Sequence, residues 1–439
     1  MAASNEKVVK NAAWIIGVRI VQSILALVIS MLTARYLGPS NYGLISYASS
    51  VVAFVVPIMQ LGLPSILVQE IVNKPKQEGE ILGTSIVLSV TSSFACMLGV
   101  FAFANVVNTG ETTTIIVCAL YSTLLFAQAI EIVQYWFQAK LASKYVSITS
   151  LVAYAIVSAY KIFLLVTGKS IYWFAVSNAL DYAIIGIALL IIYRRLSGCR
   201  LHFSLPLAKS MLAKSRYYIV SNIMITIFAQ TDRIMLKLMI DDASAGYYAA
   251  AVSCAGMTGF IFGAVIDSMR PMIFESRKTS NGAFEKNVSR LYSIIIYLSF
   301  AQSVFMTLFA PLIVRILYGV EYQNTIGVLQ VLVWYTTFSY MGSVRNIWIL
   351  AEDKQRYLWI INLSGALTNV VLNAALIPSI GVVGAAIASL ITQVFTNVVV
   401  GFIIKPIRKN NELMIRGMNP KFAIEQVKII LSKVGVIKS

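Results

Sequence analysis

Long runs of apolar residues alternate with short polar segments along almost the whole chain. A helix needs about 20 apolar residues to cross the hydrocarbon core of a bilayer. Twelve runs reach this length, at 12–36, 42–64, 81–106, 113–137, 146–167, 172–193, 215–239, 246–269, 289–310, 325–350, 357–377 and 382–404. The pattern therefore predicts an all-α integral membrane protein with twelve transmembrane helices.

A weak internal repeat divides these spans into two sets of six. The pattern Trp136, Ala139, Lys144, Tyr145 returns 212 residues later as Trp348, Ala351, Arg356, Tyr357. Tyr42-Gly43 likewise corresponds to Ala245-Gly246. Parallel repeats are typical of two-bundle transporters whose substrate site lies between the halves. We expect two pseudo-symmetric six-helix lobes around a central cavity, at 1–200 and 201–405, and a basic cytoplasmic tail at 406–439.

Charge sets the expected orientation. The chain is 58% hydrophobic and 12% charged, with a net charge of +17. With the N-terminus inside, inner segments contain 27 of the 35 Lys and Arg, and outer segments contain Lys169, Lys237 and Arg315. An excess of basic residues in cytoplasmic loops fixes topology, so both termini should be cytoplasmic. Membrane orientation therefore explains the excess positive charge better than nucleic-acid binding does, and membrane lipids are the expected partners of the basic inner segments.

Ionisable residues inside spans usually face a bundle interior or a hydrated cavity. The basic ones are Arg19, Arg35, Lys161, Arg233 and Arg345; the acidic ones are Glu131, Asp181 and Asp232, with Asp267 near an inner end. Helical spacing aligns several of them with other polar residues on one face of a span. These stripes are Arg19, Gln22, Ala26, Ser30 and Thr33 in span one; Ser150, Tyr154, Ser158 and Lys161 in span five; Asn222, Thr226, Gln230, Arg233 and Lys237 in span seven; and Asn362, Gly365, Asn369 and Asn373 in span eleven.

The stripes lie at repeat-related spans, which suggests a shared hydrated cavity along the pseudo-symmetry axis. Polar contacts between packed helices are an equal alternative for the Asn and Ser residues. For Lys161 and Arg233 the cavity is favoured, because contacts between packed helices seldom use an unpaired cation. We predict that Arg19, Lys161, Arg233, Arg35, Arg345, Gln230 and Asn222 bind substrate. Arg35 and Arg345 also lie near span ends, where a long side chain can reach the membrane interface instead. Glu131 and Asp232 are the candidates for ion coupling, and Glu131 would alternatively be the structural partner of a cation such as Arg19.

Signals for catalysis or metal binding are absent from the sequence. The four cysteines lack ligand-like spacing and lie outside the predicted outer loops, so neither a disulfide nor a metal site is indicated. Gly168-Lys169-Ser170 resembles the end of a P-loop, but Phe163 stands where its first glycine belongs. The single histidine, His202, excludes a Ser-His-Asp arrangement inside the membrane. We expect no cofactor and no enzymatic activity.

Several segments together resemble the polysaccharide (O-antigen) flippase family of the multidrug/oligosaccharidyl-lipid/polysaccharide exporter superfamily. The more specific stretches run from Leu37-Gly38-Pro39 to Tyr42-Gly43 and from Gln230 to Leu236; the weaker ones are 11–14, 246–251 and 373–388. The resemblance implies an antiporter in the bacterial inner membrane that works by alternating access, driven by H⁺ or Na⁺. It would move an undecaprenyl-pyrophosphate-linked oligosaccharide, such as a lipopolysaccharide repeat unit, and would have other polysaccharide-assembly proteins as further partners.

Three rival functions give different expectations. A drug and toxin exporter of the same superfamily should have an acid-dominated cavity, whereas bases here at least equal acids inside the spans. A flippase for peptidoglycan precursors usually has fourteen spans. A membrane polymerase or ligase needs a sizeable outer loop for its catalytic groups, and the longest predicted outer loop, 311–324, is short.

Overall fold

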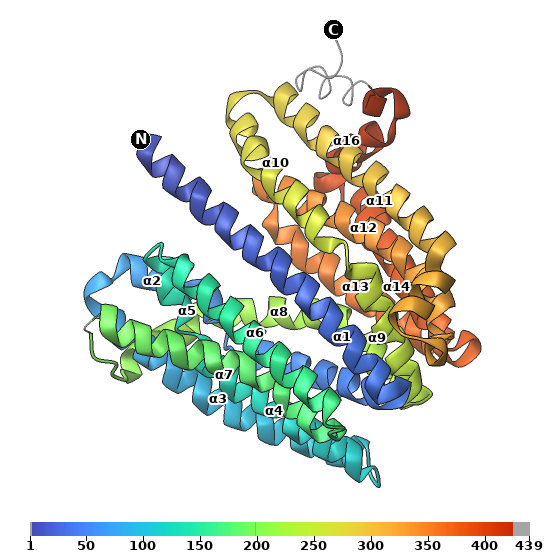
Figure 1. Ribbon diagram of the computed structural model, residues 1–439. Helices are drawn as coiled ribbons and strands as arrows, with labels where there is room; N and C mark the ends of the chain where they lie inside the picture. Colours follow the sequence, from blue (N-terminus) through green and yellow to red (C-terminus); the bar gives the residue numbers. More distant parts are fainter. Residues whose placement is uncertain (1, 198, 425–439) are drawn as a thin grey trace. The chain divides into compact units, whose positions relative to one another are not determined.

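The computed structural model describes residues 2–424 apart from Gly198, without the side chains of residues 2–20 and Ser221. This part of the chain is almost entirely helical and contains no β-strand (Figure 1). The predicted all-α membrane class is confirmed. Two compact units divide the chain, Met1–Gly246 and Tyr247–Ser439, and each is described by itself.

Nine helices in the described residues are long and apolar enough to cross a membrane. A tenth candidate is the pair Asp242–Gly256 and Gly259–Thr279, bent by 44° at a short break. One of the nine, the 53-residue run Val21–Asn73, contains most of two predicted spans. The helix Thr325–Ala351 is not among them, since its polar residues lower its hydropathy. The multi-pass character is thus established, and the count of twelve stays a prediction.

The first unit consists of long helices that pack lengthwise. Figure 1 shows α3, α4 and α7 side by side, and α1 contacts α4, α6 and α8. The helices are α1 (Ala2–Met59), α2 (Pro64–Asn73), α3 (Glu78–Val107), α4 (Thr112–Glu131), α5 (Gln134–Ala139), α6 (Ser143–Val166), α7 (Ile171–Leu196) and α8 (Leu205–Met239), with the start of α9 (Asp242–Gly256). The predicted boundary near residue 200 assigned α8 to the second lobe; here α8 packs with the first unit. The lobe division itself stays a prediction.

Glycine permits two close approaches in the first unit. Gly38, with φ 71°, breaks α1 between the two predicted spans, and only glycine adopts this conformation without strain. Beyond the break, Gly43 lies directly against Gly246 of α9. A Cβ added to Gly43 would overlap the Asp242 carbonyl oxygen and lie 2.6 Å from the Gly246 nitrogen. The two glycines that the internal repeat makes equivalent therefore touch each other.

The connector between α7 and α8 lies against α3. A Cβ on Gly83 would lie 2.6 Å from the carbonyl oxygen of His202, and one on Gly79 would overlap that of Arg200. The Ser204 amide also donates to Thr84 Oγ1 at 3.0 Å. The connector is therefore fixed along one face of α3 by backbone packing.

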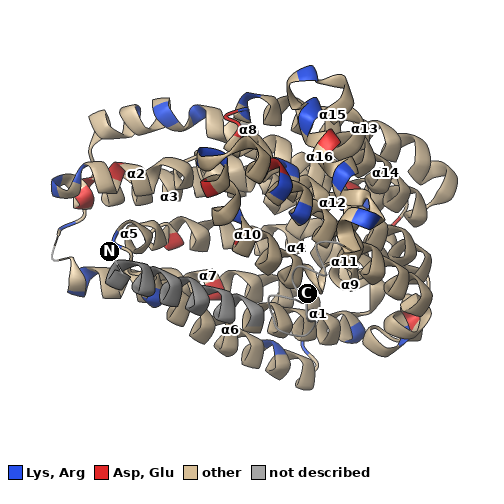
Figure 2. Cartoon of the chain, turned by 90° about the horizontal axis from the view of Figure 1, so that it is seen from above, with Lys and Arg blue, Asp and Glu red and all other residues tan. Residues whose placement is uncertain are grey.

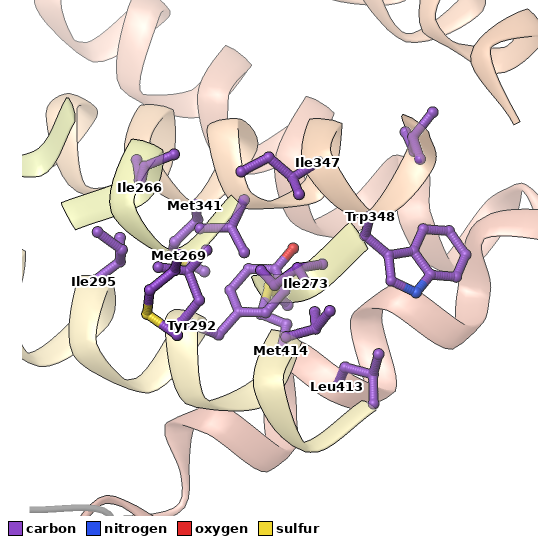
Figure 3. Packing of buried hydrophobic residues seen from close by; sticks show 14 of the residues in the cluster. Ile266, Met269, Ile273, Tyr292, Ile295, Met341, Ile347, Trp348, Leu413 and Met414 are labelled. Atoms are coloured by element: carbon purple, nitrogen blue, oxygen red, sulfur yellow. The ribbon is translucent and has the colours of Figure 1, made fainter. Parts of the chain in front are cut away.

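The second unit has a core of buried Met, Ile, Tyr and Trp side chains from α10, α11, α12 and α16, several of them labelled in Figure 3. Its helices are α10 (Gly259–Thr279), α11 (Asn281–Leu317), α12 (Thr325–Ala351), α13 (Leu358–Ile380), α14 (Val382–Val394), α15 (Val400–Ile403) and α16 (Arg408–Met418), with a π-helical turn at Phe395–Val399. The start of the predicted tail, α16, packs on α11, where Tyr292 donates to Asn410 Oδ1 at 2.9 Å. The rest of the tail, 425–439, lies outside the described residues.

Candidate functional site

A cavity of about 290 Å³ lies within the first unit, between α1, α4, α6 and α7. Most of the length of α6 and α7 carries no charged residue, as the tan ribbon in Figure 2 shows. The cavity nevertheless has a strongly polar lining: Ser30, Thr33, Tyr42, Tyr121, Tyr154, Ser158, Lys161, Asn178, Asp181 and Tyr182. Hydroxyls, an amide and one charge of each sign thus gather in an otherwise apolar bundle.

Lys161 is the basic residue of this cavity. Its Nζ donates to Asn178 Oδ1 at 2.9 Å, and the Asn178 amide nitrogen donates to the Phe174 carbonyl at 2.9 Å. Asp181 lines the same cavity, but no ion pair within 4 Å joins it to Lys161 in the described chain. Lys161 is therefore positioned by a neutral amide, which leaves its charge available to an anionic ligand.

Two predicted stripes face this cavity. Ala26, Ser30 and Thr33 line it from α1, and Tyr154, Ser158 and Lys161 line it from α6. Ser30 and Tyr42 share a hydrogen bond of 2.8 Å, which joins the two halves of α1 across the Gly38 break. Both stripes therefore line a cavity within the first unit, and the central cavity between the two lobes stays a prediction. Arg19, at the start of the first stripe, has its side chain outside the described residues.

The stripe on α8 meets a different surface. Arg233 Nη1 donates to Gln230 Oε1 at 2.9 Å, and Ser50 of α1 donates to the same oxygen at 3.1 Å. Asp232 is buried, and the Asn222 backbone carbonyl accepts a bond from Thr226 at 2.9 Å. None of these four predicted site residues lines the Lys161 cavity. Their roles in substrate binding and coupling stay predictions.

Lys237, the last member of that stripe, is 6% exposed and pairs with Glu111 at the start of α4. Asp242 Oδ1 lies 3.6 Å from the same ammonium. Hydrogen bonds from Lys237 and Thr114 hold the pKa of Glu111 below its ordinary value. This cluster fastens the end of α8 to α4 beside the Gly43–Gly246 contact.

Arg35 is exposed, as expected for a side chain that reaches the interface. Arg345 is not: it is 5% exposed and donates to the Thr396 carbonyl at 2.7 Å within the π-helical turn. The expectation that Arg345 reaches the interface is therefore wrong, because a π-turn carbonyl binds its guanidinium inside the second unit. The stripe on α13 is also packed, since Asn369 and Asn373 are fully buried and bond to each other at 3.1 Å.

Glu131 lies at the end of α4 and lines a second cavity of about 270 Å³, which shares Tyr182 with the first. Asn178 and Asp181 were not among the predicted binding or coupling residues. Their spacing of three in span six places them on one helical face, so the signal was present. Of the tyrosines that surround them, Tyr154 belongs to the predicted stripe of span five, whereas Tyr42, Tyr121 and Tyr182 follow no pattern that separates them from ordinary packing residues.

Comparison with known proteins places the chain in a family. The model of the family described as polysaccharide biosynthesis protein matches residues 8–277, more than half of the chain. The chain belongs to this family. The resemblance to polysaccharide flippases is thereby confirmed at the family level. No curated protein sequence matches significantly.

Solved structures of several membrane transporters share the fold. The inward closed form of the lipid II flippase MurJ has a TM-score of 0.72 at 14% identity, covering 91% of this chain and 90% of that one. An inward-facing multidrug resistance MATE transporter of the MOP superfamily gives 0.68 at 14%, covering 88% and 94%. The MATE multidrug transporter DinF-BH gives 0.61 at 13%, covering 92% and 96%. At such identities the likeness establishes the fold alone.

Proposed function

We propose that this protein is a flippase that moves an undecaprenyl-pyrophosphate-linked oligosaccharide across the bacterial inner membrane by alternating access, coupled to H⁺ or Na⁺. The observation that carries the proposal is Lys161 in its polar cavity. An ammonium without an ion pair within 4 Å would make charge-assisted hydrogen bonds with a pyrophosphate. The surrounding hydroxyls would accept hydrogen bonds from sugar hydroxyls and donate hydrogen bonds to them. The family match supports the same class of substrate.

The single-residue test is Lys161→Ala, made in a strain that lacks the gene. One charge-assisted hydrogen bond is worth about 1.5–3 kcal/mol. Since about 1.4 kcal/mol is tenfold, loss of Lys161 should slow export by roughly one to two powers of ten. Lys169→Ala is the matched control, because Lys169 is exposed in the loop between α6 and α7.

The readouts are restored surface polysaccharide and the leaflet distribution of lipid-linked intermediates, at equal protein levels in the membrane. Lys161→Arg should retain part of the activity, since it keeps the charge. Wild-type export by Lys161→Ala would remove the cationic-cavity mechanism.

A drug exporter of the same superfamily is the second candidate, and Asp181 is the observation that favours it. A carboxylate in the cavity suits a cationic substrate as well as Lys161 suits an anionic one. Asp181→Asn should abolish export of cationic drugs if this function is correct, and Lys161→Ala should then leave it intact. The opposite pattern, with polysaccharide as the readout, supports the flippase.

A further inference from the structure

The second cavity of the first unit, which Glu131 lines, is built differently from the Lys161 cavity. Its polar lining consists of oxygen-bearing side chains around one carboxylate: Gln60, Ser89, Gln128, Glu131, Gln134, Tyr135 and Tyr182. Among the described residues that line it, Glu131 is the only charged one, and no ion pair within 4 Å involves it. A single buried negative charge inside a membrane bundle is costly unless a cation compensates it.

Two buried oxygens in this cavity lack a partner. Ser85 and Ser93 of α3 donate to the carbonyls of Ile81 and Val90, each at 2.7 Å. Ser89, one turn from each, is 1% exposed, and its Oγ makes no hydrogen bond. Gln128 Oε1 is likewise buried without a partner. Because buried polar groups are nearly always bonded, these two oxygens point to a ligand.

Two helix ends add to the negative potential at this point. α1 ends at Met59, next to Gln60, and α4 ends at Glu131, with a short turn before α5. The carboxyl end of a helix carries a partial negative charge. Broken transmembrane helices use such ends to coordinate cations. When Glu131 is ionised, the cavity therefore combines one full negative charge and the partial negative charges of two helix ends with neutral oxygen donors.

We propose that this cavity is a Na⁺ site and that Na⁺ bound there is the coupling ion of the flippase; the coupling role rests on the proposed function, whereas binding does not. Hard cations take oxygen ligands, and one carboxylate with neutral amide and hydroxyl oxygens balances a single positive charge. A proton would satisfy one carboxylate oxygen and leave Ser89 and Gln128 unpaired. A divalent ion would bury an uncompensated charge.

Thermal unfolding of the purified full-length protein tests binding. At fixed pH and ionic strength, NaCl should raise Tm with saturation and KCl should not. Ser89→Ala should raise the half-saturating Na⁺ concentration about tenfold or more, since loss of even an outer-shell partner typically lowers metal affinity by about 10–100-fold. Glu131→Gln should abolish the effect. Ser85→Ala and Ser93→Ala, in neighbouring turns of α3, should keep it.

Equal shifts in Na⁺ and K⁺, or an unchanged Na⁺ shift in both Ser89→Ala and Glu131→Gln, would overturn the site. A second measurement concerns coupling: polysaccharide export by cells or vesicles with Na⁺ replaced by K⁺. Export that is indifferent to this replacement, in a protein that binds Na⁺, overturns the coupling role and leaves both the site and the flippase proposal standing.

Discussion

The contact between Gly43 and Gly246 gives the sharpest test of the packing in the first unit. In Gly43→Ala, the new methyl group would overlap the Asp242 carbonyl oxygen and lie 2.6 Å from the Gly246 nitrogen, whereas ordinary contacts are 3.4–4 Å. The obstructing atoms belong to the backbone, so no rotamer change relieves the overlap. The two segments must therefore separate by roughly 1 Å.

The expected cost follows from two opposing effects. Overpacking of this kind destabilises by about 1–3 kcal/mol, while replacing a helical glycine by alanine gains about 0.5–1 kcal/mol. Since the overlap is with backbone, we take the upper part of the first range and expect a net loss of about 2 kcal/mol. Gly99→Ala is the control: nothing lies within 4 Å of its added Cβ, so it should stabilise α3 by about 0.5–1 kcal/mol.

The assay is denaturant unfolding of purified protein in detergent, followed by tryptophan fluorescence and circular dichroism. Gly43→Ala should unfold at lower denaturant than the wild type and Gly99→Ala at higher. The double variant Gly43→Ala/Gly246→Ala should lose less than the sum of its parts, because both methyl groups open one contact. If Gly43→Ala matches Gly99→Ala, the close approach is absent from the folded protein.

Three further predictions follow from the charged residues. Because the pKa of Glu111 is lowered, its pairing stabilises the fold above its ordinary pKa of 4.5, and this stabilisation is lost as pH falls through the lowered pKa. The unfolding free energy of Glu111→Gln should therefore depend less on pH between about pH 3 and 7 than that of the wild type. Identical pH profiles for the two proteins would contradict this. Arg345→Gln should lower the unfolding free energy by about 1–3 kcal/mol, because the Thr396 carbonyl loses its donor. Arg35→Gln is the control: Arg35 is exposed, so the unfolding free energy should change by less than about 0.5 kcal/mol. Equal losses in the two variants would show that the buried hydrogen bond of Arg345 is not made. Single cysteines at positions 110, 243 and 380 should react with a membrane-impermeant reagent added outside, whereas single cysteines at 75, 200 and 420 should not. Labelling of position 200 from outside would reject the expected topology.

The sequence predicted the helices better than their partners. Apolar runs long enough to cross the bilayer core located most of the spans. The 3.6-residue helical period identified the faces of α1 and α6 that line the Lys161 cavity. The same period says nothing about which helix a face will meet. Arg233 and Arg345 therefore looked alike as intramembrane cations, although one bonds a glutamine on its own helix and the other a carbonyl in a π-turn.

The second cavity shows a similar limit. Glu131 stood out because an acid is rare in an apolar span, but Ser89 is one of several serines in α3 and resembles the others in sequence. Only the folded protein shows that its neighbours Ser85 and Ser93 bond their own backbone while Ser89 does not. The contact of Gly43 with Gly246 is intermediate, since the repeat paired the two residues without indicating that they touch.

The packing of the α7–α8 connector on α3 has a consequence for expressing the protein as two separate fragments. Arg200 and His202 rest against Gly79 and Gly83 through their backbone carbonyls, and Ser204 is held by Thr84. These contacts do not require the chain to be continuous at Gly198. Two fragments, 1–198 and 199–439, made as separate polypeptides in one cell, should therefore reassociate through these contacts. Bulky residues in place of Gly79 and Gly83 should prevent this reassociation.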